Sequence, residues 1–176
     1  MSAPALSEPR IETAFPGGLS ALVDRYDGFL LDQWGVLHDG TRPYPQAIAC
    51  LERLRAAGKA VIILSNSGRS GRDNEAVLAS MGFPRHLYDR VASAGDDARE
   101  ALLERSEPAY RNLGTRCLLL ARPGEDRLAA GLGLTLVGSA EAADFRFVMS
   151  MDPASQSVAG WKPGVEQALG RDLSMI

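Results

Sequence analysis

Two short apolar runs, each ending on a polar residue, constrain the fold of this chain more than any other feature. Residues 28–31 lead into Asp32, and residues 61–64 lead into Ser65. The segment between them, 44–57, has apolar residues at helical spacing and is followed by a glycine, which often ends a helix. Short continuous apolar runs are typical of the buried strands of a parallel sheet. The pattern therefore predicts a βαβ unit, and such a crossover is right-handed in almost all proteins.

The predicted crossover brings Asp32 and Ser65 to the same edge of the sheet. Open α/β sheets bind their ligands at the carboxyl ends of the strands. A buried carboxylate is costly there unless a metal or hydrogen bonds hold it, although a strand-end acid that only caps a loop remains an alternative. After the second strand, Asn66, Ser67 and Arg69 precede a predicted helix. Such a loop offers hydroxyls, backbone N–H groups and a guanidinium at the start of a helix. It is therefore predicted to bind phosphate.

Both strand ends are similar to motifs of one known family. Segment 31–40, Leu-Asp-Gln-Trp-Gly-Val-Leu-His-Asp-Gly, resembles the Asp-x-Asp-Gly-Val-Leu motif of the haloacid dehalogenase-like (HAD) hydrolases. Segment 62–70, Ile-Ile-Leu-Ser-Asn-Ser-Gly-Arg-Ser, resembles the second motif, a hydroxyl followed by Asn at a strand end. The similarity is to the branch with a large α/β cap, the p-nitrophenylphosphatase and nucleotide-phosphatase-like group. It covers residues 20–105 well and is weaker toward the end of the chain.

The resemblance implies a role for each matching residue. Asp32 is expected to be the nucleophile that forms an aspartyl-phosphate, and to give one oxygen to Mg²⁺. The backbone carbonyl of Trp34 is expected to be a second metal ligand. Ser65 is expected to hydrogen-bond the phosphoryl group, and Asn66 to orient the substrate or the loop. The implied substrate is a small phosphorylated molecule.

Trp34 is the main departure from the family pattern. The family usually has an Asp at this position, which acts as general acid for the leaving group. Such help contributes about 10²- to 10⁴-fold in rate, and Trp has no proton to give near neutral pH. His38 or Asp39 could substitute as the acid. The other reading makes them an exposed turn closed by Gly40, with Trp34 as a hydrophobic wall over the site.

The expected fold class is α/β, with a Rossmann-like parallel core and part of an α/β cap. We expect an N-terminal arm over 1–18, the first half of the core over 19–105, and a partial cap over 106–176. Caps of this kind select the substrate and exclude water. Alternating residues over 144–150 predict a half-exposed cap strand, and 164–169 a cap helix.

The motifs that the family places late in the chain are not matched. Lys162, in Trp-Lys-Pro-Gly, superficially resembles the family's late Lys motif, but it would precede the completion of the cap. The sequence ends within an apolar run, 173–176, where domains rarely end. We therefore expect the 176 residues to be a fragment of a longer protein, with very low activity by itself. The alternative function is a non-catalytic phosphate-binding module or an incomplete domain.

Composition restricts the class of protein and the kinds of partner that the chain can have. Hydrophobic residues make up 45% and charged residues 23%, which is typical of a globular domain. A net charge of −3 gives no electrostatic argument for nucleic acid. No apolar run approaches a membrane span, and no signal peptide pattern is seen, so we expect a cytoplasmic protein without a membrane partner. A homo-oligomer is compatible with the sequence. Cys50 and Cys117 are expected to be reduced thiols in or near the core.

Overall fold

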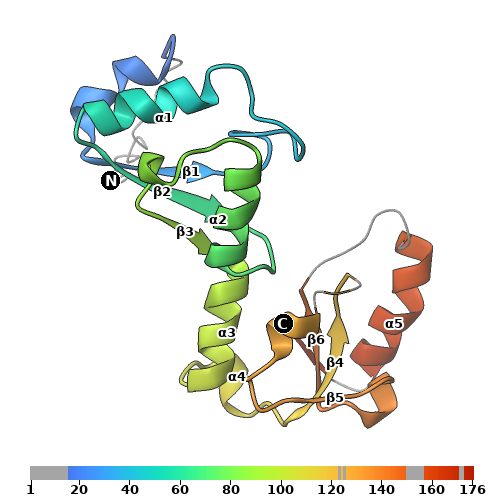
Figure 1. Ribbon diagram of the computed structural model, residues 1–176. Helices are drawn as coiled ribbons and strands as arrows, with labels where there is room; N and C mark the ends of the chain where they lie inside the picture. The colour runs from blue at the N-terminus through green and yellow to red at the C-terminus, as the bar shows by residue number, and fades with distance from the viewer. Residues whose placement is uncertain (1–15, 123, 125, 150–156, 171–172) are drawn as a thin grey trace, which may run out of the picture.

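The computed structural model describes residues 16–122, 124, 126–149, 157–170 and 173–176. It has two parallel sheets with helices packed against them, so the predicted α/β class is confirmed. Figure 1 shows the two sheets as separate layers joined by the long helix α3. The elements of the first half are η1 Leu19–Ala21, η2 Val23–Arg25, β1 Gly28–Asp32, α1 Ala47–Ala56, β2 Ala60–Ser65, α2 Gly71–Ser80, η3 Arg85–Leu87, β3 Arg90–Ser93 and α3 Ala94–Glu104.

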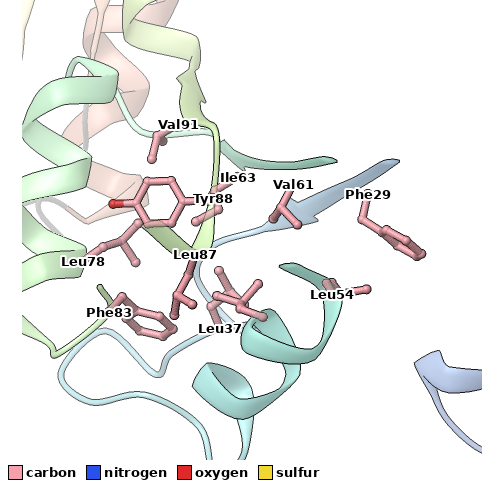
Figure 2. Packing of buried hydrophobic residues seen from close by; sticks show 11 residues of the cluster. Phe29, Leu37, Leu54, Val61, Ile63, Leu78, Phe83, Leu87, Tyr88 and Val91 are labelled. Carbon is pink, nitrogen blue, oxygen red and sulfur yellow. The ribbon is translucent and has the colours of Figure 1, made fainter. Parts of the chain in front are cut away.

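The first sheet has strand order β1-β2-β3, with both pairs parallel, as the βαβ pattern predicts. One face carries Phe29 from β1, Val61 and Ile63 from β2, and Val91 from β3, and this face is buried under α1 and α2. Tyr88, Phe83 and Leu87 from the segment before β3 complete the cluster, which Figure 2 shows packed around Leu37 and Leu78.

The opposite face of this sheet differs from the prediction. Leu30 is 66% exposed and Leu64 is 41% exposed. The continuous apolar runs predict burial on both faces, whereas among the described residues only one face is buried. The apolar runs show that both faces of the sheet are apolar. Burial of each face depends on which elements of the fold lie over it.

Hydroxyl caps fix several helix starts. Ser70 Oγ accepts the N–H of Asp73 at 3.1 Å at the start of α2, and Ser93 Oγ accepts that of Asp96 at 3.1 Å before α3. Helix α1 begins later than predicted because Gln46 has a left-handed backbone, with φ of 66°. The predicted order of strand, helix and strand is unchanged by this shift in the start of α1.

The second sheet has order β5-β4-β6-β7, all parallel. Phe145 and Phe147 from β6 pack with Cys117 and with Leu102 from α3 in a second cluster. Arg146 is only 3% exposed, so the half-exposed strand predicted over 144–150 is wrong: β6 is a central strand, flanked on both sides.

The elements of this half are α4 Pro108–Arg111, β4 Arg116–Leu120, η4 Asp126–Ala129, β5 Thr135–Leu136, η5 Ala140–Ala142, β6 Phe145–Val148, α5 Val158–Gly170 and β7 Ser174–Met175.

Helix α5 also differs from its prediction. It begins at Val158 rather than at residue 164. Ser157 Oγ accepts the N–H of Gly160 at 3.1 Å, which is the hydrogen bond of a helix N-cap. Residues 150–156, before this helix, lie outside the described residues.

Helix α3 connects the two halves of the chain. Its first residues follow β3 directly, and Leu102 near its end belongs to the second cluster. The predicted boundary after residue 105 falls just beyond the helix, where Arg105 has a left-handed backbone. Most of the predicted arm, residues 1–15, lies outside the described residues, so the three-part division stays a prediction.

The two thiols lie where the sequence predicts. Both are free cysteines: Cys117 is buried and Cys50 is half-buried. Burial raises the pKa of the Cys117 thiol to about 11, so it is protonated near neutral pH. None of the helices in the described part of the chain has the length and apolar character that a bilayer crossing requires.

Candidate active site

A cleft of about 410 Å³ lies at the carboxyl ends of β1 and β2. Asp32 is the last residue of β1 and Ser65 the last of β2, and Asp32 pairs in register with Leu64, the residue before Ser65. The cleft therefore opens where the crossover argument expects a ligand. The residues expected to act as nucleophile, metal ligand or phosphate ligand all line it: Asp32, Trp34, Ser65, Asn66, Ser67 and Arg69. Their chemical roles stay predictions.

The loop after β2 is held in place by its own side chains and by α2. The N–H of Ser67 donates to Ser65 Oγ at 3.4 Å, and the N–H of Arg69 to Ser67 Oγ at 3.1 Å. Asn74 is 2% exposed, and its Nδ2 donates to the carbonyls of Arg69 at 3.3 Å and Ser70 at 3.0 Å. The loop is thus preorganised by an amide that sequence reasoning missed. Its place four residues after Ser70, on the same helical face, is the signal that could have found it.

Three backbone segments meet closely beside this loop. A Cβ on Gly68 would lie 2.2 Å from the carbonyl oxygen of Met149, at the end of β6. A Cβ on Gly95, in α3, would lie 2.2 Å from the carbonyl oxygen of Gly68. Because these neighbours are backbone atoms, neither glycine position has room for a side chain. The contact ties the site loop to α3 and to the second sheet.

We expect Gly95→Ala to destabilise the protein by about 2 kcal/mol, since the methyl group forces backbone atoms of the site loop apart. Urea unfolding followed by circular dichroism measures the change. Gly138→Ala is the matched control, because nothing lies within 4 Å of a Cβ there. Equal unfolding midpoints for the two variants would contradict the close contact.

Asp32 is exposed to the cleft, so the expected cost of burying its carboxylate does not arise among the described residues. Its Oδ1 accepts the N–H of Gln33 at 2.8 Å. The carboxylate is therefore oriented by the backbone and remains accessible to a ligand in the cleft.

Trp34 forms a wall of the cleft, as one of the two sequence readings proposes. Its side chain is 67% exposed and lines the cleft beside Asp32. Its ring lies against Gly40, where a Cβ would be 3.3 Å from Trp34 Cζ2. Gly40 also has a φ of 100°, which favours glycine. The close contact and the backbone conformation both fit glycine at this turn.

The structure disfavours His38 and Asp39 as substitute acids. His38 is 3% exposed, so the predicted exposed turn is wrong for this residue, and burial lowers its pKa. Asp39 is exposed, but it is not among the residues that line the cleft. Its carboxylate accepts the N–H groups of Thr41 and Arg42, and these bonds lower its pKa. A neutral buried imidazole and a stabilised carboxylate are both poor proton donors near neutral pH.

The second half of the chain also reaches the cleft. Arg122, just after β4, and Met149, just after β6, both line it. Local sequence patterns carry no signal for this contact, because it depends on how the two sheets pack. An arginine here adds a positive charge near the predicted phosphate loop.

A family model described as haloacid dehalogenase-like hydrolase matches residues 29–135, which include both strand ends of the cleft. The chain belongs to the haloacid dehalogenase-like hydrolase family. The resemblance seen in the two motifs is thereby confirmed.

Individual relatives agree with this HAD assignment. Human chronophin is 32% identical over 136 residues, which are 77% of this chain and 46% of chronophin. A haloacid dehalogenase-like hydrolase from Brucella suis superposes with a TM-score of 0.78 at 29% identity, covering 91% of this chain and 58% of that one. A glycerol phosphate phosphatase from Mycobacterium tuberculosis in complex with magnesium has a TM-score of 0.56 at 20% identity, covering 84% and 42%. The chain thus spans about half the length of these HAD relatives.

The donor atoms at the cleft are oxygens. The Asp32 carboxylate and the Trp34 backbone carbonyl are ligands of the type that Mg²⁺ accepts, and Mg²⁺ commonly binds one or two carboxylates together with waters and substrate phosphate. Among the described residues, no group of three or more His, Cys, Asp or Glu side chains gathers at one point. The two oxygens at the cleft are of a type that suits a divalent metal whose other ligands are waters and substrate phosphate.

Proposed function

We propose that the protein is a Mg²⁺-dependent phosphatase that hydrolyses a small phosphomonoester through an aspartyl-phosphate. The observation that carries this proposal is the convergence of Asp32 with the loop of Ser65, Asn66, Ser67 and Arg69 on one cleft. A carboxylate beside a phosphate-binding loop is the minimum set for nucleophilic attack on phosphorus.

In this mechanism, an Asp32 carboxylate oxygen attacks phosphorus while the bond from phosphorus to the ester oxygen breaks. The ester oxygen leaves with the bonding electrons, and water then hydrolyses the aspartyl-phosphate to regenerate the carboxylate and release phosphate. The hydroxyl of Ser65 donates to a phosphoryl oxygen, and Arg69 adds positive charge to the cleft. The Gln33 N–H, bonded to Asp32 Oδ1, orients the nucleophile.

Asp32 and the Trp34 carbonyl would hold the Mg²⁺. When bound, this ion supplies charge neutralisation that brings the anionic ester and the carboxylate together. The magnesium complex of the M. tuberculosis phosphatase, which shares the fold, supports the choice of metal.

Trp34 restricts the leaving group. With no acid at this position, and with His38 and Asp39 poorly suited, the departing oxygen must leave as an anion. Aryl phosphates, whose leaving groups are weakly basic, are therefore the preferred substrates.

A non-catalytic phosphate-binding module is the second candidate. It is favoured by Trp34 in place of the acid, and by the few metal donors among the described residues. In this reading the loop of Ser65 binds phosphate and Asp32 performs no attack.

The test is hydrolysis of 4-nitrophenyl phosphate by the 176-residue chain, followed by absorbance with Mg²⁺ and again after EDTA. We expect slow turnover that stops on chelation and returns when Mg²⁺ is added. Calorimetric binding of inorganic phosphate without any turnover would favour the binding module. Neither turnover nor binding would contradict both functions.

A further inference from the structure

The segment that follows Asp32 folds back on itself as a tight loop. The N–H of Leu37 donates to the carbonyl of Gln33 at 2.9 Å, and the N–H of Gly35 to the carbonyl of His38 at 2.9 Å. Further along, the N–H of Tyr44 donates to the carbonyl of Leu37 at 2.9 Å. The loop is thus compact and returns to its own start, where Trp34 lies.

Two buried polar side chains lie inside this loop. Gln33 is 5% exposed and His38 is 3% exposed. Polar groups buried to this degree are retained only when they are hydrogen-bonded, so each one needs a partner. Neither side chain has an assigned role in the proposed chemistry, although both border the cleft.

The hydrogen bonds of His38 fix its protonation. The N–H of Gly40 donates to Nδ1 at 2.9 Å, so Nδ1 carries no proton and, in the neutral ring, Nε2 does. The side-chain amide of Gln33 lies 3.2 Å from Nε2. The amide orientation that fits this tautomer presents Oε1 as the acceptor of the Nε2–H group.

His38 therefore connects the two residues that border Trp34. Gln33 precedes Trp34 in the chain, and Gly40 lies under its indole ring. Trp34 is 67% exposed, and Gly40 is one of the residues against which its side chain packs. The position of Gly40 in turn depends on its bond to His38.

We propose that His38 is a positioning residue that holds Gly40 against the Trp34 indole, so that Trp34 stands as a fixed wall of the cleft beside Asp32. The hydrogen bond from the Gly40 N–H keeps Gly40 against the indole, and the hydrogen bond to Gln33 orients the imidazole. What the wall does to a substrate rests on the proposed phosphatase function, but the position of Trp34 is measurable without substrate.

The first test uses Trp34 as its own reporter. The chain has two tryptophans, and Trp161→Phe leaves Trp34 as the single indole. Time-resolved fluorescence anisotropy of this parent then separates local motion of the indole from tumbling of the protein. Circular dichroism verifies that each variant is folded.

Two substitutions separate the two bonds of His38. His38→Asn places an oxygen near the Nδ1 position and keeps an acceptor for Gly40, whereas His38→Gln places its amide near Nε2 and loses that acceptor. We expect the amplitude of fast indole motion to rise about two-fold in His38→Gln and to stay near the parent value in His38→Asn. A loss of stability alone does not produce this order. His86→Gln, at the other histidine of the chain and on the surface, is the control and should match the parent.

Equal anisotropy in folded His38→Gln and the parent overturns the proposal, as does equal loosening by both His38 variants. A measurement without substitutions covers the case in which the variants fail to fold. Long-range ¹H–¹⁵N NMR of the unsubstituted chain should show the Nε2–H tautomer of His38 at neutral pH, and an Nδ1–H tautomer overturns the proposal. Absence of phosphatase activity in the unsubstituted chain contradicts the proposed function and leaves these readouts unchanged.

Discussion

Asp32→Asn abolishes Mg²⁺-dependent hydrolysis of 4-nitrophenyl phosphate. The amide has no anionic oxygen, so it is a poor nucleophile toward phosphorus and a poor ligand for Mg²⁺. We expect kcat to fall by about 10³-fold or more, the scale on which removal of a catalytic nucleophile acts. Initial rates at saturating substrate, with the background rate without enzyme subtracted, measure the loss.

Asp32→Asn is a specific test because it removes the charge of this side chain and changes little else in the structure. Asp32 is exposed, and the oxygen of an Asn side chain can still accept the Gln33 N–H that the carboxylate accepts at 2.8 Å. The fold and the phosphate loop should therefore persist, which a thermal melt verifies.

Asp27→Asn is the matched control for this experiment. Asp27 is an exposed acid just before β1, at the opposite end of the strand from the cleft. It should keep the parent rate. Full turnover by Asp32→Asn would exclude the aspartyl-phosphate mechanism, whereas unchanged phosphate binding with no turnover is the expected result.

The sequence predicted the features that depend on neighbours along the chain. The βαβ pattern placed Asp32 and Ser65 at adjacent strand ends, and both line the cleft. The cap of α3 by the Ser93 hydroxyl is a local feature of the same kind. These features follow local rules, because the order of strand and helix and the capping of helix starts depend on residues close together in the chain.

The predictions of burial that the structure contradicts share a different cause. Leu30 belongs to an apolar run and is exposed, while His38 and Arg146 belong to polar or alternating segments and are buried. In each case burial is decided by elements distant in the sequence or by a loop that folds back. The same holds for Arg122 and Met149, which reach the cleft only because the second sheet packs beside the first. Single-sequence patterns do not contain that information.

Trp34→Asp restores an acid at the position where the family usually has one, and we expect it to change the preference for leaving groups. An Asp here would stand beside Asp32 at the wall of the cleft. The value of kcat/KM for glycerol phosphate, an alkyl ester, should rise about 10²-fold, because general acid catalysis contributes about 10²- to 10⁴-fold where the leaving group is basic. The rate with 4-nitrophenyl phosphate should change far less, since its leaving group departs without a proton.

Trp34→Asn separates proton donation from the removal of the indole. It opens the wall as Asp does but has no proton to give, so the ratio of alkyl to aryl ester turnover should rise only in Trp34→Asp. Equal ratios in the two variants would show that the bulk of Trp34, and not the missing acid, limits alkyl esters. If neither variant improves on the parent, another residue already protonates the leaving group. His38 and Asp39 have lowered pKa values, so that acid would have to lie elsewhere in the protein.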